Sequence, residues 1–199
     1  MWEYRVSWTN RPPSWWDRAW RNGIGVRLVP ETRIDTYWII DGRDDLGVKR
    51  RGAHSSLEIK VRHERSQEWE LWEKVIFQVW TTLESVRCAA LLQIDPAFAA
   101  EAADPVQGLR TLLASAGLAW REHAVHKTRL QADAHALLAN VPALSVNRNC
   151  LAELVHFRID QRPQSAWSVC FESAVPAAVT GNDPGRTGFV GGYPELLSR

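Results

Sequence analysis

The stretch 47–65, GVKRRGAHSSLEIKVRHER, decides the fold that this sequence predicts. Residues 57–64 alternate without a break, and in an extended chain they would separate two faces: Leu57, Ile59, Val61 and His63 on one, and Glu58, Lys60, Arg62 and Glu64 on the other. Such alternation is typical of a β-strand with one face packed on apolar side chains. The preceding run places Lys49 and Arg51 on one face, and residues 52–56 can form a turn. The stretch therefore predicts a β-hairpin with cations along one face, which is either an ordinary solvated face or the floor of an anion site.

Four further segments place charged residues among apolar ones in an extended chain. They are residues 1–8 with Glu3 and Arg5, residues 119–131 with Arg121, Lys127 and Arg129, residues 150–159 with Glu153, and residues 165–173 with Glu172. A short polar segment separates the last two, a spacing that suits an antiparallel hairpin. The repeated pattern indicates a sheet of largely antiparallel strands, with cations and a few carboxylates gathered on strand faces.

The remaining periodic segments predict two further strands and three helices. They are strands at 24–29 and 33–40 separated by Pro30, a helix over 66–79, a helix over 105–116, and a short helix opening at Pro194. In the first helix, Trp69, Trp72, Ile76 and Val79 recur at the spacing of an apolar helix face. The second has an N-cap residue followed by proline at its start and a glycine just past its end. Periodicity does not separate strand from helix in residues 81–98.

Residues 9–23 contain paired prolines and many polar residues, which indicates a loop. Trp15, Trp16 and Trp20 lie in this loop among arginines, and such indoles can form a stacking platform for bases or sugars. The preferred interpretation is simpler, namely that the indoles pin the loop to the core. The Gly- and Pro-rich segment that follows residue 175 predicts a flexible tail.

The composition bounds the classes of function. The 199 residues carry 24 basic and 23 acidic side chains, a net charge of +1, so no overall field attracts the protein to nucleic acid or to a membrane. Three cysteines without a CxxC spacing indicate reduced thiols and a cytoplasmic location. The N-terminus lacks the features of a signal peptide, and no apolar run reaches the roughly 18 residues of a membrane span. Nucleic-acid and membrane partners are therefore not expected, and any anion selectivity must come from the local arrangement of charges.

These segments predict one domain over residues 1–199. Its expected class is α+β: an antiparallel β-barrel or strongly curved sheet, tunnel-like, with helices packed on the outside. In a closed barrel the cations would line the interior, where burying them is costly unless anions compensate their charge. Phosphates suit this role because arginine offers planar bidentate contacts and lysine a point charge. Carboxylates among the cations could hold Mg²⁺ or Mn²⁺, which prefer oxygen ligands and bridge to phosphate.

This layout resembles the CYTH superfamily of triphosphate tunnel enzymes, which includes thiamine triphosphatases, adenylyl cyclases and inorganic triphosphatases. The matching segments are WEYRV (2–6), RIDTYWII (33–40), LGVKRRG (46–52), LEIKVR (57–62), VHKTRLQ (125–131), CLAELVHF (150–157), AWSVCFES (166–173) and GGYPELL (191–197). That family folds as an antiparallel barrel whose interior carries alternating Lys, Arg and Glu. The resemblance covers most of the chain as a pattern, and it implies a cation-lined tunnel here.

The resemblance also implies roles for individual residues. The implied contacts to a phosphate-rich substrate are Arg5, Lys49, Arg51, Lys60, Arg62, Lys127 and Arg129, and the implied ligands of Mg²⁺ or Mn²⁺ are Glu3, Glu153 and Glu172. The first strand of the family carries the motif ExExK, whereas the corresponding face here reads Glu3, Arg5 and Ser7. A cation thus replaces one metal-binding carboxylate, and a serine replaces the lysine.

The altered motif favours binding over hydrolysis. We expect the protein to bind a triphosphate, a polyphosphate or a nucleotide, and no catalytic residue is assigned. One alternative is an active, metal-dependent triphosphatase. Another, from a different class, is an RNA- or sugar-binding module that uses the Trp15–Trp20 loop.

Overall fold

The structure is a computed structural model that describes residues 1–9, 11–22, 26–139, 150–160, 162, 164–175 and 189–198; the side chains of residues 26–29 are not described. The chain divides into two compact units. Unit 1 comprises Met1–Arg33, His63–Trp72 and Val125–Gly192, and unit 2 comprises Ile34–Arg62, Glu73–Ala124 and Tyr193–Arg199. The single domain over residues 1–199 stays a prediction.

The strands form one hydrogen-bonded sheet. They are β1 (Trp2–Trp8), β2 (Val26–Ile40), β3 (Leu46–Arg51), β4 (Leu57–Ser66), β5 (Trp69–Phe77), β6 (Trp120–Asp133), β7 (Leu151–Ile159), β8 (Ser165–Ser173) and β9 (Phe189–Val190). Their pairing order is β5-β4-β3-β2-β6-β7-β8-β1-β9, and β5 also pairs with β1, so the order closes on itself. The pairs β1–β8, β2–β3, β3–β4, β6–β7 and β7–β8 are antiparallel. Strand pairing therefore confirms the α+β fold with an antiparallel β-barrel that the sequence predicts.

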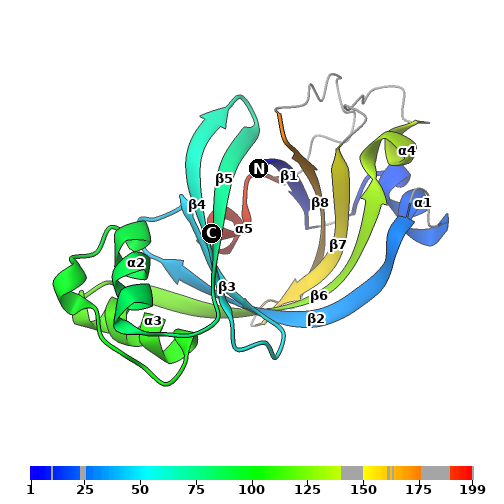
Figure 1. Cartoon of the computed structure of the whole chain (residues 1–199). Helices are drawn as coiled ribbons and strands as arrows, with labels where there is room; N and C mark the ends of the chain where they lie inside the picture. The colour runs from blue at the N-terminus through cyan, green and yellow to red at the C-terminus, as the bar shows by residue number, and fades with distance from the viewer. Residues whose placement is uncertain are drawn as a thin grey trace. The chain divides into compact units, whose positions relative to one another are not determined.

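Unit 1 has its own apolar core between strands and two helices. Strands β6, β7 and β8 run side by side (Figure 1), and their apolar side chains join those of β1 against α1 (Ser14–Asn22) and α4 (Ala134–Leu138). Tyr4 and Val6 point into this core. Because successive side chains of a strand point to opposite faces, Glu3 and Arg5 lie on the other face of β1. The alternation seen in the first eight residues thus separates a core face from a charged face.

Unit 2 packs the helices α2 (Thr82–Leu92) and α3 (Pro105–Ser115) on the apolar faces of its strands; a 3₁₀ turn (Pro96–Phe98) and α5 (Tyr193–Ser198) complete it. The two longer helices lie next to each other (Figure 1). Thr81 caps α2, and the Asp104 side chain accepts hydrogen bonds from the backbone N–H groups of residues 106 and 107 at the start of α3. A Cβ atom at Gly108 would lie 2.2 Å from the ring of Trp80, so this close contact requires glycine.

Most of the strands and helices predicted from the sequence are confirmed. The hairpin of residues 47–64 is β3 and β4, with Gly52 in its turn at a φ of 53°, where glycine is favoured. The first strand, the strand over 119–131, the hairpin over 150–173, the helix with the Asp104 cap and the terminal helix are also present. Residues 81–98, which periodicity did not resolve, form α2 and the 3₁₀ turn. The part of the expected flexible tail that spans residues 176–188 lies outside the described residues.

The helix predicted over 66–79 is wrong. This segment forms β5, which pairs with β1 at Trp2–Leu71 and Glu3–Glu70. Its burial follows a period of two near the end, with Phe77 buried and Ile76 49% exposed. Tryptophan and β-branched residues fit a pleated surface well, and their spacing matched a helix by coincidence.

Two further predictions need correction. The loop predicted over 9–23 contains α1, because the prolines precede the helix: the carbonyl of Pro13 accepts hydrogen bonds from the backbone N–H groups of Trp16 and Asp17. The strand break at Pro30 is absent, because β2 runs from Val26 to Ile40. Proline fits the extended backbone wherever its missing N–H is not needed for pairing. Among the described residues, the structure has no helix long and apolar enough to cross a membrane.

Candidate functional site

Unit 2 has three basic side chains around the buried carboxylate of Glu58. The name unit 2 cluster is used below for this group, which consists of Glu58 with Lys49, Arg51 and Lys60. Strand register places Lys49 directly opposite Glu58. The Nζ atom of Lys49 lies 3.1 Å from Oε1 of Glu58, and Nη2 of Arg51 lies 2.9 Å from Oε2. Asp35, which is fully buried on β2, pairs in register with Arg51. These five side chains comprise three basic and two acidic groups.

The charges of this cluster set the ionisation of Glu58. Burial alone would raise the pKa of Glu58, but the neighbouring charges of Lys49 and Arg51 outweigh that effect and lower the pKa from 4.5 to about 2. The Tyr37 ring lies 5.7 Å from Lys49 Nζ and 5.3 Å from the ring of Tyr193. Lys49 therefore lies between an ionised carboxylate and the ring of Tyr37.

Arg62 lies apart from this cluster, although it alternates with Lys60 in the sequence. Its guanidinium donates to Asp44 at 3.2 Å and to Glu195 of α5 at 3.1 Å. Two acidic partners from different segments of unit 2 indicate that Arg62 ties the terminal helix to the turn before β3. A role in phosphate contact stays a prediction for this residue.

Unit 1 holds the other predicted cations in a chain of alternating charges. Arg129 of β6 donates from Nε to Glu31 at 2.6 Å and from Nη1 to Oε2 of Glu153 at 3.0 Å. The other oxygen of Glu153 lies 3.5 Å from Nη2 of Arg5, across the strand β8. Lys127 lies two residues before Arg129 on the same strand face and is only 4% exposed. Glu153 thus bridges two guanidinium groups.

A row of glutamates crosses three neighbouring strands of unit 1. Glu3 of β1 lies directly opposite Glu70 of β5 on one side and Glu172 of β8 on the other. Glu70 is compensated by the guanidinium of Arg65 and by the indole N–H of Trp72, which donates to it at 3.2 Å. Like charges directly opposite each other destabilise a strand pair.

The only group in the described part of the chain with metal-ligand spacing is Glu3, Cys170 and Glu172, whose ligand atoms all lie within 4.8 Å of one another. The thiol of Cys170 is fully buried and lies 3.8 Å from Oε2 of Glu3. Burial raises the pKa of Cys170 well above its ordinary value. Two of the three metal ligands expected from the resemblance lie together here, whereas Glu153 lies with the arginines instead.

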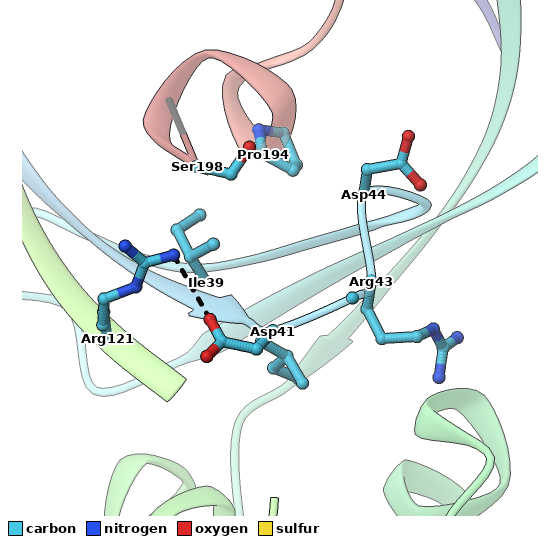
Figure 2. A pocket seen from close by; sticks show the side chains of 9 residues that line it. Ile39, Asp41, Arg43, Asp44, Arg121, Pro194 and Ser198 are labelled. Atoms are coloured by element: carbon cyan, nitrogen blue, oxygen red, sulfur yellow. Dashed lines mark hydrogen bonds and ion pairs between the residues drawn. The ribbon is translucent and has the colours of Figure 1, made fainter. Parts of the chain in front are cut away.

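A separate pocket of about 210 Å³ lies in unit 2, at the end of β2. Figure 2 shows Asp41 and Arg121 joined by an ion pair of 3.2 Å, with Ile39, Pro194 and Ser198 nearby. Both charged side chains are about half exposed, and such solvated pairs contribute little. None of the predicted phosphate or metal contacts lines this pocket, so the chemistry of the clusters does not depend on it.

Sequence reasoning missed several members of these clusters. Asp35 and Tyr37 alternate in RIDTYWII and could have been assigned to the face of Lys49 by the pairing of adjacent strands. Cys170 shares the parity of Glu172 on one strand, but the cysteine count predicts only a reduced thiol there. The partners of Arg129 could not be inferred, because Glu31 lies 98 positions away in the sequence.

Comparison with known proteins gives matches in structure alone. No protein-family model and no curated protein matches this sequence. Among solved structures, HpAC1 from Hippeastrum, a proposed adenylyl cyclase with a dominant triphosphatase activity, matches with a TM-score of 0.44 and 12% identity over 88% of this chain and 80% of that chain. The PH1012 protein from Pyrococcus horikoshii OT3 matches with a TM-score of 0.47 and 11% identity over 87% of this chain and 80% of that chain.

A further match is a proposed adenylate cyclase from Bacillus halodurans, with a TM-score of 0.40 and 13% identity over 87% of this chain and 81% of that chain. The TM-scores lie below 0.5, and the functions of these proteins do not extend to this chain on their strength.

Proposed function

We propose that the protein binds a phosphate-rich anion, such as a triphosphate, a polyphosphate or a nucleotide, through the cations of its strand faces. The observation that carries this proposal is the unit 2 cluster, in which Lys49 and Arg51 contact Glu58 while Lys60 lies close enough to lower its pKa further. A largely buried cluster of three basic and two acidic side chains offers a phosphate group several charge-assisted contacts at once. Of the cations in unit 1, Arg5, Lys127 and Arg129 are proposed as further phosphate contacts.

Hydrolysis of a triphosphate is the second candidate function, and it requires a metal. The fit is favourable for two of the three expected ligands, since Glu3 and Glu172 converge with Cys170 within 4.8 Å. Mg²⁺ or Mn²⁺ held by these carboxylates would supply charge for a transferring phosphoryl group and orient a water molecule. The residues of the chain itself would hold the metal and neutralise the phosphates. Binding remains the primary proposal, because Arg5 occupies the strand face between the positions of Glu3 and Ser7.

Replacing Glu172 with glutamine should weaken Mn²⁺ binding by at least about tenfold, because a ligand carboxylate becomes a neutral amide. The matched control is Glu153→Gln on the neighbouring strand, which should leave Mn²⁺ affinity unchanged, since Glu153 contacts Arg5 and Arg129. Titration of Mn²⁺, followed by the electron paramagnetic resonance signal of the free ion, measures both. Equal weakening by the two replacements would make Glu153 a ligand, as the resemblance implies.

The double replacement Arg51→Ala and Lys60→Ala should weaken binding of tripolyphosphate by about 100-fold, because each charge-assisted contact contributes roughly a tenfold factor or more. Isothermal titration calorimetry at two salt concentrations measures the affinity. Replacing the exposed Arg158 of β7 with alanine removes one charge outside the clusters and should change the affinity little. A double variant that binds as tightly as the wild type would refute the proposal for this cluster.

Activity is tested separately from binding. Phosphate release from tripolyphosphate and nucleoside triphosphates, with Mg²⁺ or Mn²⁺ present, would establish the second function. Tight binding without turnover would leave the first function standing alone.

A further inference from the structure

Ser7 of β1 has a buried hydroxyl group that nothing described in the structure satisfies. The residue is 2% exposed, and its Oγ atom has no hydrogen-bond partner among the described residues. An orphaned polar group in a protein interior is costly, and each such group requires an explanation. The sequence pattern treats this position only as a lost lysine, so its hydroxyl has no assigned role.

The neighbours of Ser7 include a hydroxyl group and a guanidinium group on one side and Phe189 of β9 on the other. Strand register places Ser7 directly opposite Ser168 of β8, which is fully buried. Arg5 lies two residues before Ser7, on the same strand face, and its Nη1 atom lies 3.4 Å from the Ser168 hydroxyl. Two hydroxyl groups and a guanidinium group therefore lie on one face of neighbouring strands in unit 1, and this chemistry suits an oxyanion.

A carboxylate of the chain already binds the guanidinium groups of this region. Glu153 accepts from Nη2 of Arg5 through one oxygen, and from Nη1 of Arg129 through the other. The contact with Arg5 is long, at 3.5 Å, whereas the contact with Arg129 is 3.0 Å. A phosphoryl group has three oxygens, so it can engage the two hydroxyls and the Arg5 guanidinium together.

We propose that Arg5, Ser7 and Ser168 form a subsite for one phosphoryl group, and that the Glu153 carboxylate is the internal anion with which this group competes. The inference rests on the proposed function, since it presumes that the protein binds a phosphate-rich anion. It assigns to Ser7 the role of a hydroxyl donor to a phosphate oxygen. In this proposal, Glu153 competes with the ligand for Arg5, and Arg5 supplies the positive charge of the subsite.

The test is calorimetric titration with pyrophosphate. Ser7→Ala should weaken binding about tenfold, because the hydrogen bond of a hydroxyl to a charged group is lost. Its matched control is Ser165→Ala, at the start of β8 and only partly buried, which should leave the affinity unchanged. Glu153→Gln should strengthen binding several-fold, because the competing charge is removed. Thermal unfolding of unliganded Ser7→Ala should show no loss of stability, since an orphaned hydroxyl is removed.

The outcomes separate this inference from the proposed function. If Ser7→Ala and Ser165→Ala both bind like the wild type while Arg51→Ala with Lys60→Ala does not, the Ser7 hydroxyl is satisfied by water alone and the subsite is refuted. If the wild type binds neither pyrophosphate nor tripolyphosphate, the proposed function itself fails. Weaker binding by Glu153→Gln would overturn the role of Glu153 as a competitor.

Discussion

Replacing Trp16 with alanine should lower the free energy of unfolding by about 4 kcal/mol, in the range expected for truncating a fully buried tryptophan. The side chain is 1% exposed, and its ring stacks on that of Trp20 at a centroid distance of 5.0 Å. Its indole N–H donates to the backbone carbonyl of Ser168 at 3.0 Å, so the replacement also leaves a buried acceptor without its donor. Denaturation in urea, followed by tryptophan fluorescence and circular dichroism, measures the loss.

Trp20→Ala is the matched control for this prediction. Trp20 lies one helical turn further along α1 and is only partly buried, so its replacement should cost clearly less stability. The alternative function, an RNA- or sugar-binding platform, predicts the opposite pattern: unchanged stability and lost binding of single-stranded RNA. The burial of Trp15 and Trp16 argues against that platform and supports the simpler interpretation, in which indoles anchor the segment to the core.

Sequence periodicity predicted strands well where one face is apolar and the other charged. The alternation in 57–64 and in 1–8 translated directly into β4 and β1, because a one-residue shift would bury charges and expose apolar side chains. Prediction from periodicity failed in segments where aromatic residues dominate. The tryptophans of β5 are compatible with both periods, and only pairing with β1 and β4 selects the strand. Composition predicts the wrong structure in 9–23, where the two prolines precede α1 and do not mark a continuous loop.

The candidate site was predictable only in part, for a similar reason. Alternate positions along a strand share one face, and this rule predicts that Lys49 and Arg51 share a face of one strand and that Lys60 lies on the charged face of the next. Parity says nothing about partners on other strands, which depend on register. The pairing of Glu153 with Arg5 joins residues 148 positions apart, and the approach of Cys170 to Glu3 joins residues 167 positions apart.

Replacing Glu58 with glutamine should lower the free energy of unfolding by about 3 kcal/mol at pH 7. The estimate follows from the fall of its pKa from 4.5 to about 2 on folding, since each unit of pKa corresponds to about 1.4 kcal/mol. The physical cause is the loss of the carboxylate that Lys49 and Arg51 contact in a buried setting. Cations left without that counter-charge repel each other and are poorly solvated.

The stability difference between the wild type and Glu58→Gln should depend on pH. Glu58 has a lowered pKa in the folded state, so its contribution is fully present above the unfolded value of 4.5 and is lost as the pH falls toward about 2. The stability difference between the wild type and Glu58→Gln should therefore be constant near neutral pH and shrink between about pH 5 and pH 2. Urea denaturation at a series of pH values measures it. Glu64→Gln, an exposed position on the same strand, should show no such difference.

Tripolyphosphate should reverse much of the loss in Glu58→Gln. Without Glu58, the cations Lys49, Arg51 and Lys60 lose one of the two carboxylates of their cluster, and an external polyanion can take its place more favourably than in the wild type. The variant should therefore bind tripolyphosphate more tightly, and a saturating concentration should narrow the stability gap, because a ligand that binds only the folded state stabilises it. Sodium chloride at matched ionic strength controls for screening. A variant that is as stable as the wild type and gains nothing from tripolyphosphate would show that the unit 2 cluster needs no compensating anion, and would remove the main support for anion binding there.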